Sequence, residues 1–444
     1  MTAKYNWAFL ISISVVSAMG GYLFGFDFAV ITGGLPFLRE TFGLNAVLEG
    51  FTTGSLAIGC IAGCIVAGNI ADRYGRKPGL LFAASIFCLS SLAMALAPNI
   101  TSFIVARFFA GIGVGMASML SPMYIAEISP PEVRGRLVTI NQLTIVLGQV
   151  VTHFENFQLR DTGPDAWRWM FGLGMIPSLL FLTGLFFVPE SPRWLLKAGR
   201  EDDSRKVLGR IGNTRFVNNT IDAIRKTLPQ EIKADFRLLF HKSIWPIVLI
   251  GIGLAVFQQF CGINVVFNYT TNIFRSIGAS STEQLLQAVY ISLVNLVFTL
   301  IAMSLVDKWG RKPLMLIGAG GLAVLYIFIG TVLRTGSGTA LSVFILSAIG
   351  IYAMSLAPLT WVLIAEIFPN RVRGTAISVA VIFLWLAYFI LVFTFPIIEE
   401  YFGNAVAFWG YAVICVLGFL FIFIKLPETK GKSLETIERE FAGH

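Results

Sequence analysis

Long apolar stretches are the feature of this sequence that most limits what it can fold into. A bilayer-spanning helix needs about 20 predominantly apolar residues, and the 444-residue chain holds twelve stretches of that kind, separated by short polar breaks and one long polar segment. Only 13% of the residues are charged, against roughly a quarter in soluble domains. We therefore predict an all-α membrane protein with twelve transmembrane helices. The predicted spans are 8–32, 48–70, 79–97, 100–123, 138–156, 168–188, 244–271, 285–306, 313–333, 341–365, 374–397 and 404–426.

Basic residues gather in the loops that follow every second span, and the opposite loops hold few. By the positive-inside rule, this asymmetry places both termini and the long polar segment 190–243 in the cytoplasm. The net charge of +8 is explained by these loops and does not indicate nucleic-acid binding. We expect a multi-pass protein of the cell (inner) membrane, with its first span retained rather than cleaved as a signal peptide.

The sequence shows no pattern typical of an enzyme, a metal site or a cofactor site. All five cysteines fall inside apolar spans, without the spacing of metal ligands or of disulfides between loops. No nucleophile with a base, metal-ligand cluster or phosphate-binding loop emerges. We expect a protein that is not an enzyme and that carries neither metal nor cofactor.

An internal repeat divides the chain into two halves. Asp72-Arg-Tyr-Gly-Arg-Lys77 recurs as Asp307-Lys-Trp-Gly-Arg-Lys312, and two further pairs of motifs recur in nearly the same register: Ala126-Glu-Ile128 with 365–367, and Pro189-Glu-Ser191 with 427–429. Such a repeat fixes the architecture. We predict two six-helix bundles, 1–189 and 244–426, with a linker of short amphipathic helices at 190–243 and a cytoplasmic tail at 427–444.

The motif set resembles the sugar porter family of the major facilitator superfamily over essentially the whole chain. The resemblance rests on the 68–77 motif, Pro189-Glu-Ser-Pro-Arg-Trp194, Gln258-Gln-Phe-Cys-Gly-Ile-Asn264 and Pro427-Glu-Thr-Lys-Gly431. It implies the major facilitator fold and alternating access around a central solute site. Among its members, the chain looks most similar to bacterial sugar–proton symporters and animal glucose carriers.

Uncharged amides and aromatic rings within the apolar spans are typical of a site for a neutral sugar. Gln142 and Gln149 lie two helical turns apart and share a face, and Gly262 is expected to loosen an amide-rich span. Single amides also join helices to one another, and single tryptophans also lie at lipid interfaces. By resemblance, the sugar-contacting positions are Gln142, Gln149, Gln258, Gln259, Asn264, Asn295, Trp361 and Trp385.

Several positions depart from the family pattern and leave the identity of the monosaccharide, hexose or pentose, open. Asn268 stands where a tyrosine is common, Tyr388 where an asparagine is common, and Leu384 where a glutamine is common. Span 5 also ends with His153 and Glu155. These two residues are interpreted either as a second titratable element or as a helix end that reaches the aqueous interface.

Asp27 is the charged residue whose place in an apolar span most demands a role, because a carboxylate there costs about 2.5–3.5 kcal/mol on insertion scales. The resemblance pairs it with Arg107 and makes this acid typical of proton symporters. We therefore predict monosaccharide import by proton symport. An Asp27–Arg107 pair that only joins spans 1 and 4 would instead suit a facilitative uniporter. A transporter-like sugar sensor is a third hypothesis.

Acidic residues beside the basic cytoplasmic loops recur in both halves. Isolated basic residues there need only serve orientation, whereas paired acids favour a state-dependent ion-pair gate. We expect links between Asp72 and Arg134 or Arg136 and between Glu127 and Arg76, and corresponding links in the second half. We also expect a protein that functions as a monomer in the lipid bilayer. The gate residues are Asp72, Arg76, Glu127, Arg134, Arg136, Glu190, Asp307, Arg311, Glu366, Arg373 and Glu428.

Overall fold

The protein is all-helical in every part that the computed structural model describes, namely residues 5–227, 236–242, 244–336, 338–368 and 372–428 without the side chains of residues 227, 236, 306, 307 and 365. Twelve segments of the described chain are long and apolar enough to cross a membrane, which confirms the predicted number of spans. The helices are α1 (Trp7–Phe42), α2 (Ala46–Tyr74), α3 (Arg76–Ala95), α4 (Ile100–Ile128), α5 (Arg134–Leu159), α6 (Ala166–Gly172), α7 (Met175–Phe187), α8 (Pro192–Lys197), α9 (Glu201–Ile211), α10 (Thr214–Thr227), η2 (Phe236–Phe240), α11 (Trp245–Phe260), α12 (Ile263–Arg275), α13 (Ser281–Trp309), α14 (Arg311–Thr335), α15 (Gly338–Met354), α16 (Leu356–Ile367), α17 (Arg373–Phe402) and α18 (Asn404–Lys425).

Three of the twelve spans are built from two helices each. They are α6 with α7, α11 with α12, and α15 with α16. The break between α11 and α12 falls at Gly262, whose φ of +86° is a conformation that favours glycine. The predicted loosening of this helix is therefore present.

The first span is longer than predicted. We expected it to end near residue 32, where two glycines, a proline and charges follow, but α1 continues to Phe42 with Pro36 inside it. Proline removes a single backbone donor, and packing of Gly33 against the side chain of Asn156 supports the helix there. Tertiary contact thus overrides local propensity.

The chain forms two compact units. Unit 1 comprises residues 1–28, 58–152 and 168–233, and unit 2 comprises 29–57, 153–167 and 234–444. The second part of α1 and the start of α2 therefore pack with the C-terminal helices, in part because the Thr32 hydroxyl donates to the Phe267 carbonyl at 2.6 Å. The two six-helix bundles predicted from the repeat, 1–189 and 244–426, are consecutive segments of the chain, and their boundaries remain a prediction.

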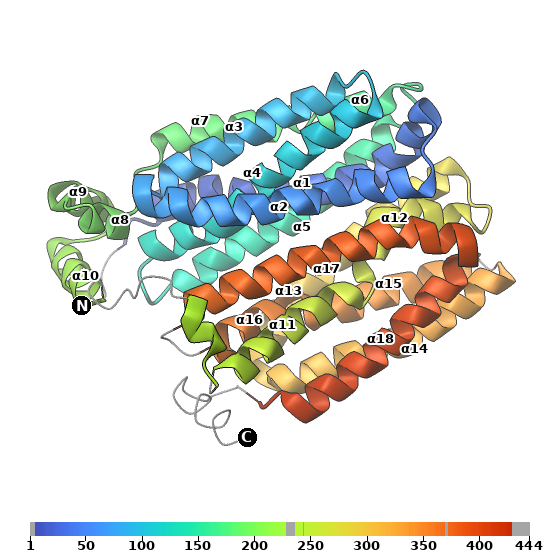
Figure 1. Ribbon diagram of the computed structural model, residues 1–444. Helices are drawn as coiled ribbons and strands as arrows, with labels where there is room; N and C mark the ends of the chain where they lie inside the picture. The colour runs from blue at the N-terminus through green and yellow to red at the C-terminus, as the bar shows by residue number, and fades with distance from the viewer. Residues whose placement is uncertain (1–4, 228–235, 243, 337, 369–371, 429–444) are drawn as a thin grey trace. The chain divides into compact units, whose positions relative to one another are not determined.

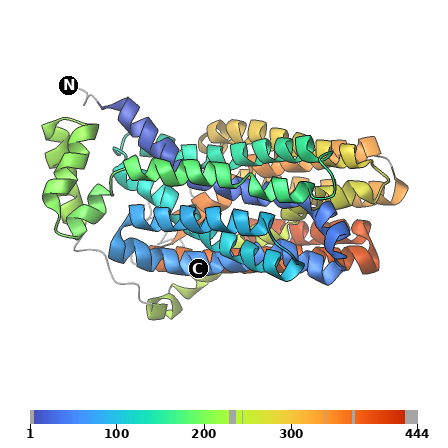
Figure 2. The same ribbon diagram turned by 90° about the horizontal axis from the view of Figure 1, so that it is seen from above.

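In unit 1, α3 packs against α4 and α7. The helices α8, α9 and α10 form a cluster at one end of this unit (Figures 1 and 2). Val207, Leu208, Ile211, Ile221 and Ile224 are buried in this cluster, which confirms the amphipathic pattern predicted for the linker. The cluster stands beside the motif that joins α2 to α3.

In unit 2, α14 packs against α15 and α18, and α11 packs against α16 and α17 (Figure 1). The break at Gly262 lies against Tyr411 of α18, because a Cβ atom there would come within 2.5 Å of that ring. Only glycine meets both the backbone angle and this close approach. The backbone angle of Gly262 and its contact with Tyr411 therefore fix the position of the amide-rich segment.

Candidate solute, coupling and gate sites

The amides around the α11–α12 break form a continuous row of hydrogen bonds. Gln259 Nε2 donates to Gln258 Oε1 at 3.0 Å, and Asn264 Nδ2 donates to Gln259 Oε1 at 2.5 Å. The three side chains are 3%, 6% and 9% exposed. Each amide has more donors and acceptors than these bonds use. The row therefore keeps polar atoms available for a hydroxylated ligand in otherwise apolar surroundings.

Asn268 and Tyr388, two of the positions that depart from the family pattern, contact each other. The Tyr388 hydroxyl donates to Asn268 Oδ1 at 3.0 Å, and Asn268 Nδ2 donates to the Asn264 carbonyl at 2.6 Å. Tyr388 also packs edge-to-face with Trp385, with ring centroids 5.9 Å apart. The two departures thus form one polar contact that continues the amide row to an aromatic wall.

The remaining predicted sugar-contacting residues are distributed over both units. Asn295 on α13 is buried, whereas Trp361 on α16 is 44% exposed. Gln142 and Gln149 lie on α5 in unit 1. Of the eight predicted residues, the structure joins Gln258, Gln259 and Asn264 by hydrogen bonds. The roles of all eight in sugar contact remain a prediction.

Asp27 and Arg107 form a fully buried ion pair in unit 1. Arg107 Nη1 donates to Asp27 Oδ1 at 2.9 Å, and both side chains are 0% exposed. Asp27 Oδ2 and Arg107 Nε have no hydrogen-bond partner within the described residues. The predicted pairing is therefore present, and the pair retains an unsatisfied acceptor next to an unsatisfied donor. Burial without full satisfaction makes such a pair sensitive to the charge of either member.

At the α2–α3 turn, one glutamate links the repeat motif to the linker helices. Gly75 has φ +108°, which exposes the next backbone N–H groups, and those of Arg76 and Lys77 donate to the Glu190 carboxylate at 3.0 and 3.1 Å. Burial raises the pKa of Glu190, while these N–H groups and the Arg76 guanidinium oppose the rise. Glu190 thus satisfies donors at the N-terminus of α3.

The ion pairs of this half agree only in part with the prediction. Arg76 Nη2 lies 2.7 Å from Glu127 Oε1, as predicted, and Ser191 donates its hydroxyl to the same carboxylate. Asp72 pairs with Arg76 at 3.9 Å and Lys197 at 3.3 Å instead of with Arg134 or Arg136. The linker helix α8 brings Lys197 within reach, a contact that motif spacing does not reveal.

The second half repeats this arrangement. Gly310 has φ +89°, and the backbone N–H groups of Arg311 and Lys312 donate to the Glu428 carboxylate at 3.0 and 3.1 Å. Arg311 Nη2 lies 3.2 Å from Glu366 Oε1, and Arg373 Nε donates to the Phe368 carbonyl at 3.3 Å. The predicted residue Asp307 has a side chain outside the described part of the structure.

A charged cluster in unit 2 was not predicted. Arg39 holds Glu49 through two hydrogen bonds, Nε–Oε2 at 2.8 Å and Nη2–Oε1 at 2.6 Å. Asn272 Nδ2 bridges Glu49 Oε1 at 2.6 Å and Glu399 Oε2 at 3.2 Å. The cluster joins α1 and α2 to α12 and α17. Its only sequence signal is that charges stand at the ends of three apolar stretches.

The structure contradicts the interpretation of His153 as part of a helix end that reaches the aqueous interface. It is 2% exposed, and neither ring nitrogen has a hydrogen-bond partner within the described residues. The neighbouring Asn156 donates to the Ala29 carbonyl at 3.2 Å. His153 therefore does not extend to an aqueous surface.

No group of three or more His, Cys, Asp or Glu side chains gathers as a metal site in the described residues.

The chain has full-length relatives of known type. The family model for sugar (and other) transporters matches residues 13–441. The D-xylose-proton symporter of Escherichia coli (strain K12) is 38% identical, with 99% of this chain and 97% of the relative covered. The arabinose-proton symporter of Bacillus subtilis (strain 168) is also 38% identical, with 99% and 96% covered.

Solved structures give the same result for the fold. The partially occluded inward-open conformation of the xylose transporter XylE from E. coli matches with a TM-score of 0.87 at 36% identity, over 96% of this chain and 100% of that chain. The proton:xylose symporter XylE bound to 6-bromo-6-deoxy-D-glucose matches with a TM-score of 0.82 at 38% identity, over 98% and 100%.

Proposed function

Because this chain belongs to the sugar transporter family, whose model spans residues 13–441, we propose that it imports a neutral monosaccharide, a pentose or a hexose, together with a proton. The relatives named as D-xylose-proton and arabinose-proton symporters support this assignment. The observation that carries it is the fully buried Asp27–Arg107 pair. An ionisable residue inside a membrane span is by default a candidate functional group, and a buried acid beside a cation is a candidate proton site.

Sugar binding is assigned to the amide row and its aromatic neighbours. Gln258, Gln259 and Asn264 offer donors and acceptors in a buried setting, and Trp385 offers a ring face next to Tyr388. Sugars combine hydroxyl groups with apolar ring faces, so both kinds of contact are needed. Gln142, Gln149, Asn295 and Trp361 complete the proposed set.

Proton coupling is assigned to Asp27 and Arg107. When Asp27 is ionised, its carboxylate balances the Arg107 guanidinium at 2.9 Å. When Asp27 takes up a proton, Arg107 loses its counter-charge in a buried site, and the helices α1 and α4 that carry the pair are favoured in another arrangement. The proton thereby biases the same structural change that moves the sugar.

Alternating access is assigned to the duplicated charged motifs. Glu190 and Glu428 accept hydrogen bonds from the backbone N–H groups at the starts of α3 and α14. Together with the Arg76–Glu127 and Arg311–Glu366 pairs, these contacts would hold the cytoplasmic ends of the helices in one state and release them in the other. The distribution of Lys and Arg supports cytoplasmic termini and insertion in the cell (inner) membrane. We propose that the monomer is the functional unit.

Uptake into proteoliposomes tests this function. A panel of labelled pentoses and hexoses is measured with and without an imposed proton gradient, for the wild type and for Asp27→Asn. We expect gradient-driven accumulation of at least one sugar by the wild type and none by Asp27→Asn, with sugar–sugar exchange preserved in both. Sugar flux without gradient dependence would establish a facilitative uniporter, and binding without flux would establish a sensor.

A further inference from the structure

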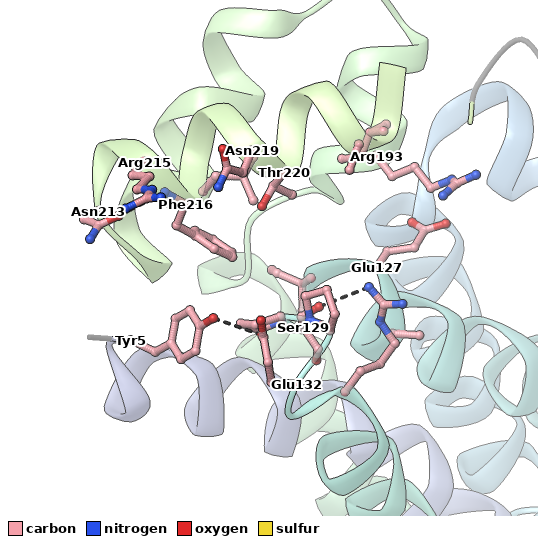
Figure 3. A pocket seen from close by; sticks show the side chains of 18 residues that line it. Tyr5, Glu127, Ser129, Glu132, Arg193, Asn213, Arg215, Phe216, Asn219 and Thr220 are labelled. Carbon is pink, nitrogen blue, oxygen red and sulfur yellow. Dashed lines mark hydrogen bonds between the residues drawn. The ribbon is translucent and has the colours of Figure 1, made fainter. Parts of the chain in front are cut away.

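A cavity of about 930 Å³ lies within unit 1, between the helices α8–α10 and the turn that joins α4 to α5. Figure 3 shows Phe216 and Thr220 of α10 on one side, with Tyr5, Ser129 and Glu132 on the other. Pockets for small organic ligands occupy about 300–1,000 Å³. Its lining includes none of the residues of the amide row and neither Asp27 nor Arg107.

Positive charge prevails around this cavity. Its charged lining residues are Arg134, Arg193, Arg215, Glu127 and Glu132. Both carboxylates already have partners: Glu127 pairs with Arg76, which lies outside the lining, at 2.7 Å, and Glu132 accepts from the Tyr5 hydroxyl at 3.0 Å. The lining thus holds three guanidinium groups and two carboxylates, and one of these carboxylates, Glu127, also pairs with Arg76, so the charge of the lining favours an anionic ligand.

The rest of the lining suits a ring that carries hydroxyl groups. The rings of Tyr5 and Phe216 pack edge-to-face with centroids 5.4 Å apart, which leaves an aromatic surface on the cavity. Asn219 and Thr220 add an amide and a hydroxyl on α10. Burial and the Glu132 carboxylate raise the pKa of Tyr5, so its hydroxyl remains protonated at neutral pH.

We propose that this cavity binds a phosphorylated sugar, with the phosphate on the arginines and the ring against Phe216. The choice of a sugar phosphate among organic phosphates rests on the proposed function. Phosphoryl transfer from a nucleoside triphosphate to a hydroxyl of an imported sugar, with the nucleoside diphosphate as leaving group, gives an anion that keeps its hydroxylated ring, and this combination matches the lining. The cavity faces the side of the chain that we assign to the cytoplasm, where that product forms.

A ligand in the cavity acts on the gate through Glu127, because this residue both lines the cavity and pairs with Arg76 in the gate. A ligand that spans α10 and the α4–α5 turn fixes the linker helices to the ends of α4 and α5, and it contacts Glu127, whose partner Arg76 lies outside the lining. A ligand that binds one conformation more tightly shifts the population toward it. The proposal therefore predicts that a sugar phosphate on the cytoplasmic side changes the rate of sugar uptake.

Binding to the purified full-length protein in neutral-lipid nanodiscs tests the proposal. Calorimetric titration with glucose 6-phosphate should give saturable binding, whereas glucose should not compete at this cavity. Arg215→Gln should weaken binding by about tenfold, the scale of one charge-assisted hydrogen bond. Thr220→Val should weaken it less. The control is Arg225→Gln on the same helix, which lies outside the lining and pairs with Glu201; its affinity should match the wild type.

Other outcomes overturn the proposal. Equal weak binding of inorganic phosphate and glucose 6-phosphate, unchanged by Arg215→Gln, indicates an adventitious ion only. Binding of an anionic phospholipid that depends on Arg215, with no sugar-phosphate binding in neutral discs, identifies a lipid headgroup as the source of the phosphate. Because the titration needs no transport, sugar uptake without this binding refutes the inference alone, and binding without uptake refutes the proposed function alone.

Discussion

Replacing Asp27 by Asn should destabilise the folded protein, because it leaves the Arg107 guanidinium without a counter-charge in a site where both side chains are 0% exposed. Breaking a buried ion pair by removing one partner costs about 3–5 kcal/mol. Asparagine keeps an oxygen at the position that now accepts from Arg107 Nη1 at 2.9 Å, so we expect about 3 kcal/mol, at the low end of that range.

The double variant Asp27→Asn/Arg107→Gln separates charge from packing. It removes both buried charges, and neutral replacement of such a pair is often without net cost, so most of the lost stability should return. Denaturant unfolding of the detergent-solubilised protein measures the three free energies. Asp203→Asn is the matched control, because its pairs with Arg200 and Lys206 are exposed, and it should change stability little. If Asp27→Asn were as stable as the wild type, or the double variant less stable than the single one, the buried-charge reasoning would be wrong.

Three further outcomes follow from the other contacts. Gln258→Ala and Gln259→Ala should each weaken sugar binding by about 1–3 kcal/mol, the cost of leaving a buried hydroxyl without its partner, and unchanged titrations of both would refute the proposed sugar site. Tyr388→Phe should lose about 1 kcal/mol of stability with the 3.0 Å bond to Asn268, whereas Tyr388→Phe in an Asn268→Leu background should lose less; equal losses would show that the two side chains are uncoupled. Glu127→Gln should shift the carrier toward cytoplasmic opening and slow transport, and an accessibility assay that detects no shift would contradict the gate.

The sequence predicts the parts of the structure that depend on regular patterns. Hydropathy predicts twelve spans, and the repeat predicts the two equivalent pairs Arg76–Glu127 and Arg311–Glu366. The hydrogen bonds that backbone N–H groups donate to Glu190 and Glu428 cannot be predicted from these patterns. They depend on left-handed glycines that turn those groups toward carboxylates more than 100 residues away.

Contacts between residues that belong to no regular pattern could not be predicted either. Asn268 and Tyr388 are each recognisable as departures from a family pattern, yet their mutual hydrogen bond depends on how α12 packs against α17. The Arg39–Glu49 pair and its neighbours Asn272 and Glu399 come from four helices. Charges at the ends of apolar stretches are ordinary in membrane proteins, so their sequence context gives no sign that these ones meet.

The energetics of the Asp27–Arg107 pair limit how proton coupling can work. A membrane potential of 100 mV supplies about 2.3 kcal/mol for each proton that crosses it, which is less than the roughly 3–5 kcal/mol lost when a buried pair is broken with no compensation. If protonation of Asp27 costs as much, the potential alone cannot offset that cost while both side chains remain at 0% exposure. Hydration of the pair, or new contacts made by Arg107, must offset part of that loss during the cycle. Under the proposed coupling, water would act at Arg107 Nε and Asp27 Oδ2, which have no hydrogen-bond partner within the described residues, and the step that admits water to α1 and α4 would also permit protonation.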